Sequence, residues 1–251
     1  MKTIVIIHNL NSRGKNINED YVRELLNKKG MKFHYFQTKQ ISDLDEIIKK
    51  YNNPSEFQYC SIGGDGSLNA LVNSLMKNNI AMPEVSCLPG GSGSDFIRTF
   101  ALPQNIEEAV EHLNNDNFYE VDVGFIKNNT DAKYFINVLN IGFLASTVEI
   151  SEKFPNLFRA FRYPLSFWIK IITARAREMS ISNDKYEFKG MAFNICICNA
   201  QYFGGGWNIS PKSSLQDGLF NIQVFAVTKF KAMQIFFLAK KGLHLRESSV
   251  K

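Results

Sequence analysis

The order of apolar and polar positions divides the chain into two parts. Up to about residue 114, short apolar runs at 3–8, 32–38, 58–62 and 85–88 are each followed by a stretch with helical spacing. Apolar runs of this length, bounded by turn residues, are typical of buried strands. Repeated strand–helix units predict an α/β region with a parallel sheet that is covered by helices on both faces.

After residue 117 the pattern changes to longer β-rich runs broken by Gly, Asn and Asp. These runs are 119–126, 133–143, 185–199 and 219–227. Two stretches with helical spacing, 163–178 and 229–241, interrupt them. The pattern predicts a second, mainly antiparallel domain built as a β-sandwich. We therefore expect a first domain over 1–117 and a second over 118–251.

Composition and charge narrow the class of protein. The 251 residues are 45% hydrophobic and 21% charged, which excludes a disordered chain. Residues 1–150 have a net charge of −4, whereas residues 151–251 carry 15 basic and 6 acidic side chains. A basic half indicates an anionic partner, such as a membrane surface, a phosphate or a nucleic acid, or only a solvated basic face. No apolar run approaches the roughly 20 residues of a membrane-spanning helix.

Cysteines, histidines and nucleotide motifs exclude several other classes. The four cysteines have no zinc-binding spacing and lie mostly in apolar stretches, which favours buried thiols in a reducing cytoplasm. The four histidines show no pattern of a Ser-His-Asp site, and the chain has neither a P-loop nor a GxGxxG motif.

Nine of the 16 glycines fall in three clusters, and the first follows a predicted strand. Residues 61–67 read Ser-Ile-Gly-Gly-Asp-Gly-Ser and precede a predicted helix. Glycines allow close approach of a ligand to the backbone, and the helix N-terminus favours a phosphate. Asp65 would repel a bare anion, so it argues for a Mg-nucleotide or a ribose contact. The alternative is a simple glycine-rich turn.

The second and third clusters lie at 88–98 and 199–211. The second follows the next predicted strand, so both loops could face one crevice at the carboxyl ends of the sheet. Asp95 would then be a second carboxylate near the phosphates, or only a favourable charge at a helix N-terminus. The third cluster, in the β-rich part, suggests a tight crossing or a bulge, and the nearby Asp217-Gly218 is also a hairpin turn signal.

Taken together, these segments resemble the diacylglycerol kinase catalytic-domain family, which includes bacterial lipid kinases and sphingosine and ceramide kinases. GGDGSLNALVNSL at 63–75 resembles its nucleotide loop, and LPGGSGSDFIR at 88–98 resembles its PxGTxNDFAR segment. NAQYFGGGWNISPKSSLQDGLFNIQVF at 199–225 resembles its second-domain signature, and HNLNSRGK at 8–15 a degraded form of its opening loop. The segments occur in the family's order along essentially the whole chain.

The resemblance implies ATP bound between an NAD kinase/diacylglycerol kinase-like α/β domain and a β-sandwich domain. Positions that match the family's nucleotide contacts are Asn9, Thr38, Gly63, Gly64, Asp65, Gly66, Ser67, Asn69, Gly91 and Ser92. Asp217 matches a Mg²⁺ ligand, helped by the carbonyls of Ser214 and Leu219. Asp65 and Asp95 would be the catalytic carboxylates that help to hold the Mg-nucleotide and the acceptor. The implied reaction transfers the γ-phosphate of ATP to the hydroxyl of diacylglycerol or a similar lipid alcohol.

Several positions depart from the family's pattern. Ala70 replaces the usual Glu, Ser94 the usual Asn and Leu10 the usual Pro. The family's Asp-Gly-Glu, whose Glu is the expected base, does not occur, and Glu247 lies in another context. We therefore expect either a product truncated at its C-terminus or a variant. Three functions remain open: a lipid kinase, a nucleotide-binding relative with impaired catalysis, or a kinase of soluble substrates of the NAD kinase type.

Residues 157–172 mix aromatic side chains with arginine and lysine, which suits a lipid interface or, equally, a core helix with a basic rim. From this stretch and the resemblance we expect a lipid substrate at the membrane surface and peripheral membrane contact. We expect a cytoplasmic protein at the inner face of the membrane, no nucleic-acid partner and a possible homodimer.

Overall fold

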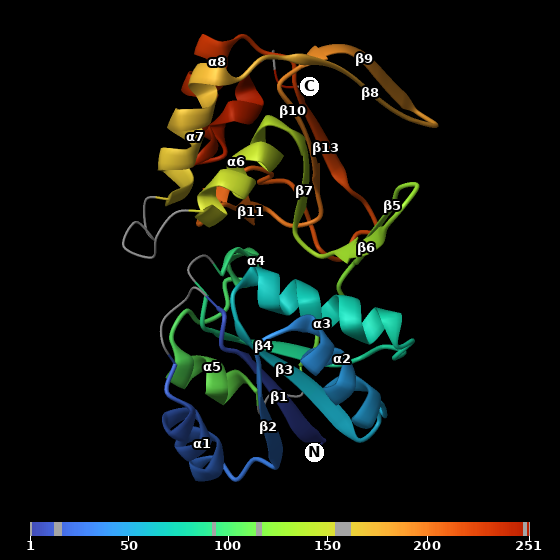
Figure 1. Cartoon of the computed structure of the whole chain (residues 1–251), viewed down its shortest axis with the longest axis vertical. Helices are drawn as coiled ribbons and strands as arrows, with labels where there is room; N and C mark the ends of the chain where they lie inside the picture. Colours follow the sequence, from blue (N-terminus) through green and yellow to red (C-terminus); the bar gives the residue numbers. More distant parts are fainter. Residues whose placement is uncertain are drawn as a thin grey trace. The chain divides into compact units, whose positions relative to one another are not determined.

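The computed structural model describes residues 2–12, 17–91, 94–113, 117–153, 162–247 and 250. The chain divides into two compact units, Met1–Ile136 and Asn137–Lys251 (Figure 1). Each unit is described by itself below.

The first unit is built on a four-stranded parallel sheet with the order β2-β1-β3-β4. Its strands are β1 (Thr3–Asn9), β2 (Phe33–Thr38), β3 (Phe57–Gly63) and β4 (Val85–Pro89). The register pairs Asn9 with Thr38 and Gly63 with Pro89, so the carboxyl ends of all four strands meet at one edge. The parallel sheet that the sequence predicts is confirmed.

Helices cover both faces of this sheet (Figure 1). Alternate residues of β1 point to opposite sides: Ile4 and Ile6 pack with α1 (Glu19–Lys28) and α5 (Ile106–His112). Val5 and Ile7 pack with α2 (Ile41–Lys50) and α3 (Asp65–Lys77). A short helix, α4 (Asp95–Thr99), follows β4. Both faces are apolar because the sheet is buried between two helical layers.

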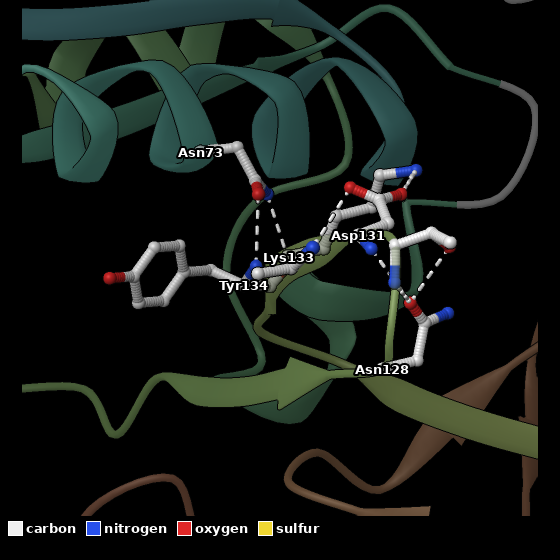
Figure 2. Close-up of polar contacts among 7 residues, drawn as sticks. Asn73, Asn128, Asp131, Lys133 and Tyr134 are labelled. Carbon is white, nitrogen blue, oxygen red and sulfur yellow. Dashed lines mark hydrogen bonds and ion pairs between the residues drawn. The ribbon is translucent and has the colours of Figure 1, made fainter.

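A hairpin of β5 (Gly124–Lys127) and β6 (Ala132–Phe135) is clamped to α3 by one side chain (Figure 2). The Asn73 Nδ2 donates to the Tyr134 carbonyl at 2.9 Å, and the Tyr134 N–H donates to Asn73 Oδ1 at 2.9 Å. The amide thus pairs with the strand as a peptide group would. The first unit therefore continues to Ile136, whereas the sequence pattern placed a boundary after residue 117.

The second unit contains an antiparallel sheet of β7 (Val138–Gly142), β10 (Asn194–Cys198) and β13 (Asn221–Phe225), in the order β13-β10-β7. A long hairpin of β8 (Arg177–Asn183) and β9 (Tyr186–Ala192) packs Phe188 against Ile195 and Val224 on one face of this sheet. The predicted antiparallel, layered architecture is confirmed.

The other face of the sheet carries the helices and the glycine-rich segment. Cys196 and Cys198 pack there with α8 (Lys229–Ala239) and with the short strands β11 (Tyr202–Phe203) and β12 (Trp207–Asn208). The helix α7 (Arg162–Thr173) joins α8 in an aromatic cluster. A short 3₁₀ helix, η2 (Leu243–Arg246), follows α8.

Two sequence predictions in this unit are wrong. The helix predicted over 163–178 ends at Thr173, and β8 begins at Arg177. The helix α6 (Phe143–Lys153) was not predicted, because the sequence pattern assigned no element after residue 143 in this stretch. A tertiary hydrogen bond starts it: the Leu144 N–H donates to Asn194 Oδ1 at 2.9 Å. Such a cap from a residue fifty positions away leaves no local signal.

Candidate functional site

Two glycine-rich loops lie against each other at the carboxyl ends of β3 and β4. The Gly90 N–H donates to the Gly63 carbonyl at 3.0 Å. A Cβ added to Gly91 would lie 2.2 Å from the Gly64 Cα, so the two backbones touch where no side chain fits. The structure thus brings together Gly63, Gly64 and Gly91, three of the predicted nucleotide-binding residues.

The Asp65 carboxylate ties the first loop to the second. Its Oδ2 accepts from the Asp95 N–H at 2.9 Å, and its Oδ1 accepts from the Phe96 N–H at 2.8 Å. Asp65 therefore caps the N-terminus of α4, where a negative charge is favourable. Sequence reasoning missed this role. The sequence holds no local signal for it: Ser94, which precedes α4, adopts a left-handed φ of 52° and gives no side-chain cap, so the cap comes from the other loop.

Asp95, the second predicted catalytic carboxylate, begins α4 and is only 3% exposed. Its Oδ1 lies 3.7 Å from Arg98 Nε. A cavity of about 10 Å³ beside the contact of the two loops is lined by Gly64, Asp65, Ser94 and Phe96, among others. This volume suits about one water molecule, so the cavity belongs to the packing of the loops and is too small for a nucleotide.

Asn9 and Ser67 join the end of β1 to the first loop. Asn9 Nδ2 donates to Ser67 Oγ at 2.9 Å, and Asn9 Oδ1 accepts from the Asn11 N–H. Thr38 is buried beside Asn9 at the end of β2, and its carbonyl accepts from the Leu10 N–H. These predicted contact residues therefore lie at the same edge of the sheet as the glycine loops.

The remaining predicted nucleotide contacts lie on or near α3. Asn69 is half-buried on the first turns of this helix, and its carbonyl accepts from Asn73 Nδ2. Gly66 is exposed, and a Cβ placed there would meet nothing within 4 Å. Ser92 lies outside the described residues.

The N-terminus of α3 has the chemistry of a phosphate cradle. Its N-cap is Gly64, which has no side chain to accept from the first N–H groups of the helix. The open space above Gly66 and the positive end of the helix dipole favour an anion at this place. The described residues therefore fit the phosphates of a nucleotide.

In the second unit, a buried polar network holds the segment after β12. Gln223 Nε2 donates to the Ile209 carbonyl at 2.7 Å and lies 3.1 Å from Ser210 Oγ. His244 Nε2 lies 2.9 Å from the same Ile209 carbonyl, and burial lowers the pKa of this imidazole. The sequence singled out neither side chain.

The predicted metal ligands lie on an exposed turn of the second unit. Asp217 Oδ1 accepts from the Leu219 N–H at 3.1 Å, and Ser214 Oγ accepts from the Gln216 N–H. Within the described parts of the chain, no three His, Cys, Asp or Glu side chains lie close enough to hold a metal ion. Asp217 provides a single carboxylate, which would bind Mg²⁺ only together with carbonyl and water ligands.

The stretch 157–172 is partly outside the described residues, which resume at residue 162. In the described part, Phe167 and Ile171 are buried, whereas Ile169 and Ile172 are exposed. No helix in the described part of the chain is long and apolar enough to cross a membrane.

Comparison with known proteins matches both units to one group of proteins. Residues 3–126 match the diacylglycerol kinase catalytic domain, and residues 137–251 match the YegS C-terminal NAD kinase beta sandwich-like domain. The chain belongs to the diacylglycerol kinase catalytic-domain family. The first matched range contains both glycine loops, and the second contains the antiparallel sheet.

Several relatives carry the names of lipid kinases. The protein named "Probable lipid kinase YegS" of Escherichia fergusonii is 25% identical over 217 residues, which cover 84% of this chain and 72% of the relative. A diacylglycerol kinase of Staphylococcus haemolyticus is 28% identical over 193 residues, 75% of this chain and 56% of the relative. A crystal structure of a diacylglycerol kinase from Bacillus anthracis shares the fold, with a TM-score of 0.69, 22% identity and coverage of 93% of this chain and 76% of that one.

Proposed function

We propose that this chain is an ATP-dependent lipid kinase that phosphorylates the hydroxyl of diacylglycerol or a similar lipid alcohol. The observation that carries the proposal is the contact of Gly91 with Gly64, which joins two glycine loops at the carboxyl ends of adjacent parallel strands. Membership of a family whose named relatives are lipid kinases supports the choice of acceptor.

In this proposal the nucleotide phosphates lie at the N-terminus of α3. Bound ATP supplies the phosphoryl group. The first N–H groups of α3 stabilise negative charge on phosphate oxygens without having to reorient. Asn9 orients the Ser67 hydroxyl through the 2.9 Å hydrogen bond between their side chains. The nucleotide contacts in this proposal are the residues of the first unit that the sequence predicts.

Asp65 and Asp95 have different parts in the proposal. Both Asp65 oxygens accept backbone hydrogen bonds from the start of α4, so Asp65 positions the second loop. Asp95 is the carboxylate proposed to assist at the lipid acceptor. Mg²⁺ would neutralise phosphate charge when bound, and Asp217, with the carbonyls of Ser214 and Leu219, is proposed to hold a structural ion.

The direct test is phosphoryl transfer by the purified full chain. With Mg-ATP and diacylglycerol in mixed micelles, labelled phosphate should appear in a lipid product. Nucleotide binding without transfer to any of several lipid alcohols would instead favour a relative with impaired catalysis. Phosphorylation of NAD and of no lipid would contradict the proposal.

A matched pair of glycine variants tests the phosphate site. At both Gly66 and Gly190 an added Cβ meets no atom closer than 3.6 Å, and neither has a left-handed φ, so Gly66→Ala and Gly190→Ala should both fold. Only Gly66 lies at the N-terminus of α3, where the methyl group would occupy the space proposed for phosphate. Calorimetry should show ATP affinity reduced about tenfold or more in Gly66→Ala and unchanged in Gly190→Ala. Equal ATP affinities of the two variants would show that the nucleotide does not bind at this loop.

A further inference from the structure

Two neighbouring helices of the second unit expose large apolar side chains. On α7, Ile169 is 44% exposed and Ile172 is 74% exposed; on α8, Phe230 is 85% and Phe237 is 65% exposed. A single exposed apolar residue is ordinary, but an exposed apolar patch with polar neighbours marks an interaction surface. These four residues are called the α7–α8 face below.

The helices α7 and α8 pack against each other within one aromatic cluster. Lys229 Nζ donates to the Ile172 carbonyl at 2.8 Å, which fixes the start of α8 beside the end of α7. The Trp168 and Phe237 rings lie 5.7 Å apart, so the helices run in opposite directions along each other. Phe167 stacks on Phe236 at 3.9 Å on the inner side. The two helices are therefore held firmly together, and their exposed apolar side chains take no part in the packing of the core.

The residues of α8 other than Lys229, Lys231 and Gln234 are apolar, and they lie on both its buried and its exposed sides. Ile235 and Ala239 are buried in the core of the unit, whereas Phe230 and Phe237 lie on an exposed side. A helix of this kind is normally covered on all sides by protein or by lipid.

Charge identifies the class of partner. Neither α7 nor α8 contains Asp or Glu. The lysines on or directly after the two helices are Lys170, Lys229, Lys231, Lys240 and Lys241, of which Lys231 is ion-paired with Glu247 and Lys229 donates to the Ile172 carbonyl. Lysine is depleted at protein–protein interfaces, but next to exposed aromatic side chains it is typical of segments that bind anionic membranes.

We propose that the α7–α8 face docks on the surface of an anionic lipid bilayer. Phe230, Phe237, Ile169 and Ile172 would enter the boundary between headgroups and acyl chains, and Lys170, Lys240 and Lys241 would contact lipid phosphates. The inference rests on the proposed function, which requires an acceptor in a bilayer, and assigns the face of the second unit that meets it.

Vesicle binding by the full chain tests the inference without nucleotide. The chain should sediment with vesicles of phosphatidylglycerol and phosphatidylcholine, and less as salt increases. The double variant Phe230→Ser/Phe237→Ser should bind at least about tenfold more weakly. Lys240→Gln and Lys241→Gln should each lose about fivefold at low salt. Phe125→Ser is the matched control, since Phe125 is 55% exposed in the first unit, and it should bind like the wild type.

Two outcomes would overturn the inference. One is unchanged vesicle binding by the double variant, with its fold verified by circular dichroism. The other is a dimer that the double variant converts to a monomer while vesicle binding persists, which would make this face a contact between copies.

Phosphorylation of a short-chain, water-soluble diacylglycerol should be unaffected by the double variant. Vesicle binding through this face without phosphorylation of any lipid would contradict the proposed function and leave the docking surface standing.

Discussion

The glycine-rich segments of the two units are held in place by different forces. In the first unit, the loops after β3 and β4 meet backbone to backbone, through the Gly90 to Gly63 hydrogen bond and the contact of Gly91 with Gly64. In the second unit, the backbone that follows Gly204–Gly206 is held by buried side chains, of which Gln223 and His244 both contact the Ile209 carbonyl.

The difference separates two uses of glycine. Gly91 is required because no Cβ fits between the loops. A Cβ added to Gly205 would meet no atom within 4 Å, but the residue has a φ of +88°. Glycine is therefore required there only by the backbone conformation. A methyl group should therefore be far more damaging in the first unit, and the variants below test that contrast.

Gly91→Ala should have the largest effect. The added Cβ would lie 2.2 Å from the Gly64 Cα, and only a backbone shift can relieve the overlap. We expect about 3 kcal/mol of lost stability, measured by urea unfolding, and loss of ATP binding by calorimetry. Gly190→Ala is the control, because its Cβ would find an ordinary contact at 3.6 Å. A Gly91→Ala protein with wild-type stability would show that the loops are not in contact.

Asp65→Asn should weaken the same pair of loops by a smaller amount. An amide can accept from only one of the Asp95 and Phe96 N–H groups, and it loses the charge at the start of α4. We expect about 2 kcal/mol of lost stability. Hydrogen exchange at those two amides should accelerate. Asp131→Asn, at an exposed carboxylate of the β5–β6 turn, should change neither measurement. Unchanged exchange in Asp65→Asn would contradict the capping role.

Features encoded locally could be predicted from the sequence. Apolar runs such as 3–8 identified the parallel strands, because both faces of the sheet are buried. The glycine clusters identified the two loops, because the backbones approach each other so closely that a Cβ on Gly91 would lie 2.2 Å from the Gly64 Cα. The antiparallel second unit followed from its β-rich runs in the same way.

Features that depend on distant partners could not be predicted. The role of Asp65 depends on N–H groups thirty residues further along the chain. In the sequence, Asn73 is only a polar residue of a helix, and its pairing with Tyr134 is visible only in the structure. In the same way, the first turn of α6 is capped by the side chain of the distant Asn194. Propensity and periodicity contain no information about such contacts, since they describe only neighbours along the sequence.

Gly205→Ala tests the other half of the comparison. Alanine would have to adopt the left-handed φ of +88°, but its Cβ would meet no atom within 4 Å. We expect a cost of about 1 kcal/mol, clearly smaller than that of Gly91→Ala, by urea unfolding. ATP affinity should not change, because Gly205 lies outside the loops of the first unit. An effect on stability equal to that of Gly91→Ala would abolish the distinction between the two uses of glycine.

A last effect, which differs from the others because it appears only in acid, belongs to His244. Burial lowers the pKa of this imidazole, and its Nδ1 has no hydrogen-bond partner among the described residues. The unfolded chain, with an ordinary pKa of about 6.5, therefore takes up a proton before the folded chain does. The contribution of His244 to stability is complete above that pH and is lost as the pH falls from about 6.5 through the lowered pKa of the folded state.

The variant His244→Asn removes the titrating group, so its free energy of unfolding should fall less steeply between pH 7 and 5 than that of the wild type. The pKa of His8 is also lowered by burial, but His8 is present in both proteins, and its contribution cancels in the comparison. Parallel pH profiles of the two proteins would mean that His244 is already charged, or already paired, in the folded chain, and that the glycine-rich segment of the second unit does not depend on a neutral imidazole.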